Sequence, residues 1–451
     1  MKYKLLAPAL VCAALTTASM AAHATTLAIP QIAAGAEHAL ALKNDGSLWA
    51  WGSNRVGVVG DSTSTMRSSP VQIGSDFVYI AAGEYQSFAI KWDGTLWAWG
   101  MNNAGQLGDG TTDNRNAPVK IGSGFIRVAS GGNHTVALKA DGSLWFWGAH
   151  IDELNGYSYQ KTPVQVGIGY KSISAGLYHW LAVKDDGTVW GRGSNEDGQL
   201  ANATGTATYQ MIQIGTGYKS VASGWRDSFG ITTEEALMAW GDNRRGQLGT
   251  QAPIDTKQFT PALVGKGYTS IAAGYLHTLA VKADESLWSW GADGFGALGN
   301  GRSVSNDQLT PKQIGTGYVA VAAGNYTSVA LKKDGTVWSW GFNSYGSVGD
   351  GSLVHREEPV QVLSLGVAPL GPTDAAVDCL LDWAQSKYVS MLSNASSSQT
   401  LASYRFRYYP LVNGYLAVSG NDKKLYAYVQ DQMQDLGDTN AWLSQTVCTG
   451  F

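Results

Sequence analysis

The chain has 451 residues, with 31 Lys and Arg against 35 Asp and Glu and a formal net charge of −4. This length accommodates one large domain and one small one. The mild acidity, without a stripe of basic residues, argues against a nucleic acid as partner. No segment after residue 24 approaches the roughly 18 consecutive apolar residues of a membrane-spanning helix, so we expect no membrane span.

The first 24 residues have the pattern of a secretion signal. Lys2 and Lys4 precede an apolar run from Leu5 to about Leu15. The segment Ala22-His23-Ala24 is typical of a signal-peptidase site. The sequence therefore predicts cleavage after Ala24 and a periplasmic or secreted protein.

Residues 28–363 repeat one unit seven times. Each unit contains a hydrophobic stretch ending in a small-small-Gly triplet, a second apolar strand, a tight turn and a Trp-Gly step, which in the fourth unit is Arg192-Gly193. The triplets end at Gly35, Gly83, Gly131, Gly176, Gly224, Gly274 and Gly324. Successive triplets are 45 to 50 residues apart, a period typical of units that stack on one another.

Within a unit the pattern predicts four antiparallel strands. Residues alternate with the period of a β-strand, as in Leu48-Trp49-Ala50-Trp51, and no long amphipathic helix occurs. Five units carry Asp-Gly where a hairpin needs a positive φ, but two carry Glu234-Glu235 and Asp284-Glu285. A segment that opens with proline, such as Pro70 to Ile73, suits an edge strand. Seven such units predict an all-β fold, a seven-bladed β-propeller of four-stranded blades.

Most of the seventeen tryptophans have a structural interpretation. Twelve occupy the two Trp positions of the third strand, which share one face, and the residue between them is mostly small, although Phe146 is not. We expect these rings to pack between blades.

The third unit departs from the repeat after Gly148. Residues 149–159 replace the usual Gly-Gln-Leu-Gly segment, either as a partner-specific insertion or as a decayed copy.

After residue 363 the repeat ends, and we expect a linker at residues 364–372 and a small α+β module at residues 373–451. In an oxidising compartment Cys379 and Cys448 are expected to form a disulfide, with two unpaired thiols as the alternative. The aromatic side chains of this module would bind glycan or envelope, or else form its own core. The expected elements are helices from Thr373 to about Leu392 and at Ala441–Cys448, and strands at Tyr404–Tyr409, Tyr415–Ser419 and Leu425–Val429.

The repeated string resembles the regulator-of-chromosome-condensation repeat family. The string Ala-Ala-Gly-x-x-His-Thr-x-Ala-Leu-Lys-x-Asp-Gly-x-Leu-Trp-x-Trp-Gly-x-Asn-x-x-Gly-Gln-Leu-Gly is matched most closely by residues 83–108 and 274–299. The resemblance extends over all seven units and implies a seven-bladed propeller. It does not imply nuclear guanine-nucleotide exchange, because an exported chain meets no Ran-type GTPase in its own cell and no residue set for that activity transfers to this sequence.

The sequence also resembles a secreted bacterial β-lactamase inhibitory protein built from seven such repeats, which fits the expected compartment better. That resemblance implies a concave protein-binding face, formed by the loop after each triplet and the loop after each Trp-Gly step. Glu37 and Asn133 are not aromatic where the inhibitor-like pattern has an aromatic residue, and Trp225 and Tyr275 stand one residue early, so the same target is not implied.

Five of the seven loops after the triplets supply a Tyr or Trp, the usual composition of a recognition surface. Trp225 lies outside the core Trp positions and is therefore a candidate contact residue; alternatively, its ring folds onto a neighbouring loop. Arg55 and Arg245 are further candidates in the second set of loops. The candidate partner-binding residues are Tyr85, Tyr178, Trp225, Arg226, Tyr275, Tyr326, Arg244, Phe295 and Tyr345.

Four histidines stand three residues after a triplet glycine, namely His38, His134, His179 and His277. A ring of imidazoles would suit a metal, but Gln86, Asp227 and Thr327 hold this position in the other units and share a hydrogen-bonding role rather than a ligand role. We therefore expect buried histidines bonded to the backbone. No Ser-His-Asp order, carboxylate pair, phosphate loop or zinc signature stands out, so no catalytic residue, metal or cofactor is assigned.

The leading hypothesis is a monomeric, non-enzymatic, exported recognition scaffold that binds a protein partner through these loops. One alternative is a carbohydrate-binding or carbohydrate-cleaving envelope protein. A second alternative is an effector resembling a guanine-nucleotide exchange factor that acts on the GTPase of a foreign host.

Overall fold

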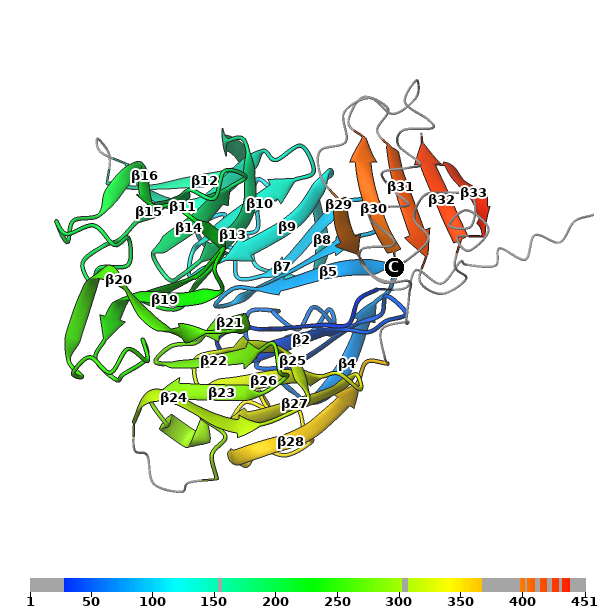
Figure 1. Ribbon diagram of the computed structural model, residues 1–451. Coiled ribbons are helices and arrows are strands. Elements are labelled where there is room, and N and C mark those ends of the chain that lie inside the picture. Colours follow the sequence, from blue (N-terminus) through cyan, green and yellow to red (C-terminus); the bar gives the residue numbers. More distant parts are fainter. Residues whose placement is uncertain are drawn as a thin grey trace, which may run out of the picture.

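The computed structural model describes residues 28–152, 156–301 and 307–366, together with five strands between residues 398 and 438. Strands β1 to β28 form seven four-stranded antiparallel sheets, arranged as blades around a central axis (Figure 1). The seven-bladed all-β propeller predicted from the repeat is confirmed. Among the described residues, the helical element is a single 3-10 turn, η1 (Gly294–Gly296).

Each blade uses four consecutive strands, and the first strand of each lines the central channel. Blade 1 consists of β1 (Gln31–Ala34), β2 (His38–Leu42), β3 (Leu48–Gly52) and β4 (Arg67–Gly74), and blade 2 of β5 (Phe77–Ala82), β6 (Gln86–Lys91), β7 (Leu96–Gly100) and β8 (Arg115–Gly122). Blade 3 consists of β9 (Phe125–Ser130), β10 (His134–Lys139), β11 (Leu144–Asp152) and β12 (Gly156–Gly167), and blade 4 of β13 (Tyr170–Ala175), β14 (His179–Lys184), β15 (Val189–Gly193) and β16 (Thr208–Gly215). Blade 5 consists of β17 (Tyr218–Ser223), β18 (Asp227–Thr232), β19 (Ala236–Asn243) and β20 (Thr256–Lys266), and blade 6 of β21 (Tyr268–Ala273), β22 (His277–Lys282), β23 (Leu287–Gly291) and β24 (Gln308–Gly315). Blade 7 is β25 (Tyr318–Ala323), β26 (Thr327–Lys332), β27 (Thr336–Gly341), β28 (Arg356–Ser364).

The turns between second and third strands take the positive φ that the Asp-Gly pairs predict. Gly46, for example, has a φ of 78°. The two units without glycine keep the same geometry, because Glu235 and Glu285 adopt φ values of 62° and 64°. A side chain with a Cβ is disfavoured in this region, so these two turns are strained.

The second tryptophan of the third strand inserts between its own blade and the preceding one. Trp99 of β7, for example, packs against Leu40, Ala50 and Val59 of blade 1. Its indole N–H donates to the backbone carbonyl of Val58, 2.8 Å away. We call the contact between two adjacent blades a seam. The same arrangement, with a fully buried ring, occurs at six of the seven seams, through Trp51, Trp99, Trp147, Trp240, Trp290 and Trp340.

The first tryptophan of the third strand is less buried than we expected. Trp49 is only half-buried, and its indole N–H donates to the hydroxyl of Ser47 in the adjacent turn at 3.0 Å. The ammonium group of Lys43 lies 4.2 Å from the ring centroid. These rings therefore fill the space between turn and strand at the edge of the seam rather than its centre.

A ring of seven backbone hydrogen bonds surrounds the central channel. In every blade the N–H of the residue after the triplet glycine donates to a carbonyl of the next blade. A Cβ on Gly274 would collide with the carbonyl oxygen of Gly324, so this close approach requires glycine. The donor–acceptor pairs are Ala36–Glu84, Glu84–Gly131, Gly132–Leu177, Leu177–Trp225, Trp225–Gly274, Tyr275–Gly324 and Asn325–Ala36.

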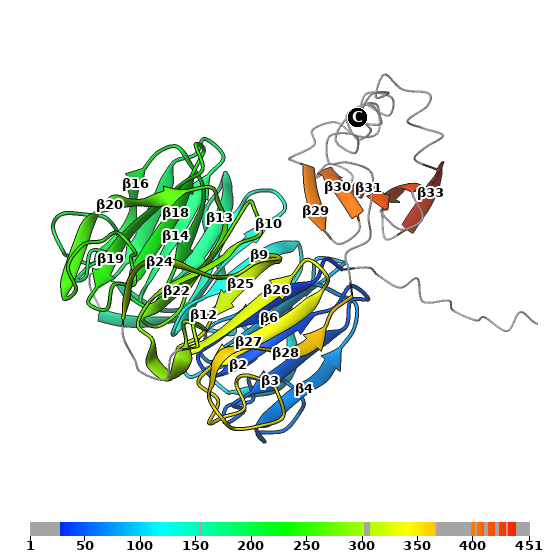
Figure 2. The same ribbon diagram turned by 60° about the horizontal axis from the view of Figure 1, so that its bottom comes forward.

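The bond from Asn325 to Ala36 joins blade 7 to blade 1, so the array is a closed ring. Figure 2 shows the last strands, β27 and β28, beside the strands of blade 1. At the same seam, the indole N–H of Trp51 donates to the carbonyl of Ser347 at 3.0 Å. Closure depends on side-by-side packing of the two terminal blades, since each blade is built from one continuous segment.

The described part of the C-terminal region is a five-stranded antiparallel sheet. The three predicted strands are present as β30 (Tyr404–Tyr409), β31 (Gly414–Ser419) and β32 (Lys424–Val429). Two further strands that the sequence did not predict, β29 (Ser398–Leu401) and β33 (Gln432–Asp438), extend the sheet on either side. The expected signal segment, the two expected helices and the Cys379–Cys448 pair lie outside the described residues.

Candidate binding face and central channel

Two sets of loops meet on one face of the propeller, which we call the triplet face. It consists of the loop after each triplet and the loop after each Trp-Gly step. In every blade a backbone N–H of the second loop donates to a carbonyl of the first at 2.7 to 3.0 Å, as in Ser53 to Glu37 and Phe342 to Tyr326. The Asp-Gly turns bond instead to the segment that starts the next blade, as in Phe77 to Gly46, and so form the opposite face, the turn face.

Six aromatic side chains on the triplet face form a continuous row across blades 5, 6 and 7, which we call the aromatic arc. The ring centroids are 4.1 Å apart for Trp225 and Tyr275 and 5.4 Å apart for Tyr275 and Tyr326. Phe295 follows at 5.5 Å from Tyr326, and Phe342 at 5.0 Å from Phe295. The row ends at Tyr345, 5.6 Å from Phe342. Because each ring packs against the next, the side chains are held in place before any partner arrives.

An arginine lies over each end of the aromatic arc. The guanidinium of Arg226 is 4.5 Å from the ring centroid of Trp225, and that of Arg55 is 4.3 Å from that of Tyr345. Cations over aromatic faces at these distances are attractive contacts. The arc thus combines planar apolar surface with positive charge at both ends, the composition of protein-binding hot spots.

Phe295 has the most unusual backbone of the arc. It lies in η1 with a φ of 59°, whereas a φ above zero is rare for an aromatic residue. Its side chain is 48% exposed. A strained backbone that presents a large apolar ring to solvent is more common at functional positions than elsewhere.

Two predicted residues lie on the triplet face but outside the arc. Tyr178 is 50% exposed and borders a cavity between blades 3 and 4. Tyr85 lies near two carboxylates, Glu37 and Glu84, and burial together with these charges raises the pKa of its hydroxyl. The pKa values of Glu37 and Glu84 are also raised, chiefly by burial. This side of the face, in blades 1 and 2, therefore brings two carboxyl groups near Arg55.

Two of the three arginines of blade 5, Arg226 and Arg244, belong to an ion-pair cluster around one carboxylate, whereas Arg245 pairs with Asp307. Asp197 lies 3.0 Å from Arg226 and 2.9 Å from Lys257, and Arg244 is 3.7 Å away. Burial acts to raise the pKa of Asp197, but hydrogen bonds from Lys257 and Arg226 outweigh it and hold that pKa below its ordinary value. Arg244 also pairs with Asp242 at 2.9 Å, so it is less available to a partner than its sequence position suggested.

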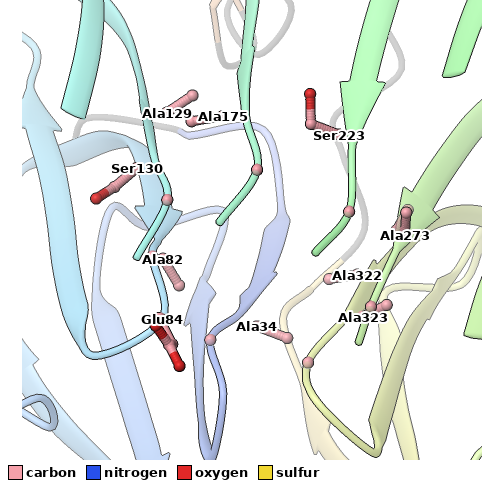
Figure 3. A pocket seen from close by; sticks show the side chains of 18 of the residues that line it. Ala34, Ala82, Glu84, Ala129, Ser130, Ala175, Ser223, Ala273, Ala322 and Ala323 are labelled. Carbon is pink, nitrogen blue, oxygen red and sulfur yellow. The ribbon is translucent and has the colours of Figure 1, made fainter. Parts of the chain in front are cut away.

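The central channel is lined by small side chains that carry few functional groups. It has a volume of about 330 Å³ and is lined mainly by the Ala, Gly and Ser residues of the first strands. Figure 3 shows these short side chains, among them Ala34, Ala175 and Ser223, with Glu84 as the long side chain among those labelled. The triplets therefore serve the close packing of the blades.

The predicted histidines are buried, and His38 and His134 have the expected backbone hydrogen bonds, but serine hydroxyls of the next blade are further partners that the sequence did not predict. Nε2 of His38 lies 2.9 Å from Oγ of Ser87 in the next blade, and His277 bonds to Ser328 in the same way at 3.0 Å. Burial lowers the pKa of these imidazoles to about 4. Each histidine thus points into its own seam, and among the described residues no three His, Cys, Asp or Glu side chains come together in a group that could hold a metal ion.

Phe342 and His355 belong to the site although the sequence did not single them out. His355 lies 5.1 Å from Phe342 and 5.0 Å from Phe295, and its Nδ1 accepts a hydrogen bond from the backbone N–H of Asn343. Phe342 is the aromatic member of a position held elsewhere by Ser53, Met101, Ala149, Ser194, Asp242 and Ala292. A comparison of this position between units would have found it.

The fold and the loop face define a seven-bladed propeller made of repeated blades. The chain belongs to the regulator of chromosome condensation (RCC1) repeat family. One profile of this repeat matches residues 45–90, 93–138, 236–281, 284–331 and 334–373, and a second matches residues 30–58, 125–152, 170–199, 268–297 and 318–347. Comparison with curated proteins gave no match.

Solved structures of the same fold share about a fifth of the sequence. Yeast RCC1 (Prp20) in a complex with Kap60 is 22% identical, with a TM-score of 0.64 over 76% of this chain and 86% of that one. A second structure of Prp20p, from Saccharomyces cerevisiae, described with its binding properties to Gsp1p and histones, is also 22% identical, with a TM-score of 0.64 over 75% and 88% of the two chains. Human WBSCR16 is 20% identical, with a TM-score of 0.63 over 73% and 95%. At this identity the likeness concerns the fold.

No helix in the described part of the chain has both the length and the apolar character needed to cross a bilayer.

Proposed function

We propose that this protein is an exported recognition scaffold that binds a protein partner through the triplet face, with the aromatic arc at the centre of the contact. The observation that carries the proposal is the continuity of the arc, in which residues from three different blades pack ring against ring. Rigid, partly exposed aromatic rings give a large contact area at a small loss of side-chain entropy.

The electrostatics of the face supports a protein partner of mixed charge. Arg55 and Arg226 lie over the two ends of the arc, while Glu37 and Glu84 lie on the neighbouring blades. Charges around an apolar centre steer association and select the partner, while the apolar centre supplies most of the affinity. The family also includes a structure in which yeast RCC1 is bound to another protein, Kap60, which agrees with a role in protein recognition.

Co-purification from the native host tests the proposal. The tagged full-length chain is compared with a Tyr275→Ala, Tyr326→Ala double variant and with Trp92→Ala, which removes a 47% exposed ring on the turn face. We expect a protein partner to be retained by the wild type and by Trp92→Ala and lost from the double variant, with unchanged melting temperatures. Equal recovery with all three chains would contradict the proposal, and retention of polysaccharide instead of protein would favour a carbohydrate-binding role.

Export is part of the proposal and has its own test. The basis is the sequence pattern of residues 1–24, which ends in Ala22-His23-Ala24. Mass spectrometry of the protein recovered from the periplasm or the medium should find an N-terminus at Thr25, and thiol labelling before and after reduction should show a Cys379–Cys448 disulfide. Recovery of the uncleaved chain from the cytoplasm alone would argue against export.

A further inference from the structure

The seam between blades 3 and 4 differs from the other six in three repeat positions at once. Arg192 of β15 replaces the tryptophan that fills the seam elsewhere. Trp180 of β14 replaces the small residue at the fourth position after the triplet glycine, which is a Ser or Thr in five blades. Phe146 of β11 replaces the small residue between the two tryptophans. These changes lie in different units, but the fold brings them together, as the stacked rings of Phe146 and Trp180 show.

The loop that normally meets the tryptophan is also absent from this seam. In blade 2 the carbonyl of Gln106 accepts hydrogen bonds from the indole N–H of Trp147 and the hydroxyl of Thr135. In blade 3 the corresponding segment instead continues the strands, so that β11 and β12 form a longer hairpin than in other blades. The seam therefore lacks both the inserted ring and the loop that would hold it.

A cavity of about 540 Å³ occupies this place and opens toward the triplet face. This volume is within the range of small-molecule sites. Phe146 and Trp180 form apolar walls, and the rim includes the exposed side chains of Tyr159, Tyr178 and Tyr209. The cavity is thus bordered by five aromatic rings from four strands and one loop.

Besides Nε of Arg226, three buried polar atoms of the lining residues have no hydrogen-bond partner. They are Nε2 of His134, Nδ1 of His150 and Oγ1 of Thr208. At other seams Nε2 of the equivalent histidine has a partner, as in His179, whose Nε2 lies 2.8 Å from Oγ of Ser228, although Nδ1 of these histidines has none. His134 lacks such a partner because Trp180 stands where the next blade would supply a hydroxyl. An unpaired buried polar atom costs free energy that a ligand with matching polar groups would recover.

Arg192 is a partly buried cation that forms no ion pair among the described residues. Burial alone lowers the pKa of its guanidinium, and its nearest aromatic contact is Phe146, at 5.8 Å from the ring centroid. The other arginine of the cavity wall, Arg226, already forms an ion pair with Asp197 at 3.0 Å. One unpaired guanidinium suits a single negative charge, and its planar pair of N–H donors matches a carboxylate.

We propose that the cavity between blades 3 and 4 binds a small aromatic carboxylate that carries a polar substituent. Its carboxylate pairs with Arg192, its ring packs against Phe146 and Trp180, and its substituent bonds to the unpaired polar atoms. A phosphate dianion is less suitable, because the cavity offers only one unpaired cation and Glu196 lies at its rim. This inference goes beyond protein binding through the triplet face and does not depend on it.

The test uses 6-hydroxy-2-naphthoate as a probe and 6-hydroxy-2-naphthamide as its neutral analogue, titrated into the full chain by calorimetry. We expect one bound naphthoate per chain and at least tenfold weaker binding of the amide. Arg192→Gln should weaken naphthoate binding at least tenfold. Lys171→Gln, which removes one charge from an exposed position of the same blade, should leave it unchanged. If Arg192→Gln does not fold, Arg192→Lys serves in its place, with binding weakened severalfold.

Each other outcome would overturn the proposal. Equal affinity for acid and amide would show that the guanidinium does not select charge. An equal loss in Lys171→Gln and Arg192→Gln would indicate diffuse electrostatics rather than a site. Absence of binding at millimolar probe would show that the altered seam is not a site for this class of ligand.

Discussion

The indole N–H of Trp99 in blade 2 donates a hydrogen bond of 2.8 Å to the backbone carbonyl of Val58 in blade 1. The same carbonyl accepts a hydrogen bond from the hydroxyl of Ser87 at 2.7 Å, and Ser87 in turn contacts the imidazole of His38. One loop carbonyl therefore joins a core ring, a hydroxyl and a histidine from two blades. The bond from the tryptophan to the loop carbonyl recurs at six of the seven seams, where it holds adjacent blades in register and fixes the loops of the triplet face.

The first prediction concerns this contact. Trp99→Phe keeps an aromatic ring in the seam but removes the N–H and part of the buried surface, so we expect a loss of stability of about 2 kcal/mol. Trp97→Phe, in the half-buried position of the same strand, is the matched control and should cost less. Urea unfolding of the two variants measures the difference. Equal losses would mean that the seam tryptophans have no special role.

The second prediction concerns the strained turns. Glu235 adopts a φ of 62° where five other units have glycine, so Glu235→Gly should stabilise the protein by about 1 kcal/mol. The ion pair that it would remove, with Lys219 at 3.6 Å, is exposed and contributes little. The midpoint of urea unfolding should rise. Glu234→Gly, at the neighbouring position of the same turn, is the control and should not raise it.

The third prediction concerns a buried acid in blade 5. Asp227 replaces the histidine of other units, and burial together with the nearby Asp242 raises its pKa well above the ordinary value. A raised pKa makes the contribution of Asp227 to stability greatest below the unfolded pKa of about 4, and this contribution is lost as the pH rises through the folded pKa. Asp227→Asn should therefore stabilise the protein more at pH 8 than at pH 4.5, by about 1 kcal/mol or more. Melting temperatures of both chains at both pH values provide the measurement, and the same difference at the two pH values would contradict the assignment.

The fourth prediction concerns the buried histidines. Because burial lowers the pKa of His277 to about 4, its contribution is fully present above the unfolded pKa of about 6.5 and is lost as the pH falls toward 4. His277→Gln places at this position the residue that blade 2 has at Gln86, and it removes the titrating group. The variant should lose less stability than the wild type between pH 7 and pH 4.5, by up to about 3 kcal/mol. If the two chains lost the same stability between pH 7 and pH 4.5, the pH dependence would not come from His277.

The sequence was sufficient for the propeller because its signals are local and repeated. The triplet glycines, the Asp-Gly turns and the alternation in the third strand recur in each unit, and each has a direct steric reason, such as the collision that a Cβ on Gly274 would cause. The placement of both loop sets on one face followed from the strand order alone. Ring closure between Ala36 and Asn325 follows from seven units of similar size.

What the sequence could not show depends on contacts between units. Phe146, Trp180 and Arg192 are separate irregularities along the chain, and their meeting at one seam requires the neighbouring blades to be placed side by side. The serine hydroxyls that contact His38, His179 and His277 lie about one unit further along the chain, so the sequence predicted backbone partners but not these hydroxyls. Strand β29 begins in a Ser-rich segment without apolar alternation, and therefore gave no strand signal.

Hydrogen exchange of the chain with and without its co-purified protein partner would test the central claim, that the aromatic arc is the centre of a protein-binding face. We predict slower exchange in the loops at residues 225–227, 275–277, 294–296, 325–327 and 342–345, and unchanged exchange in the Asp-Gly turns of the opposite face. Protection confined to those turns, or to the strands between residues 398 and 438, would contradict the account.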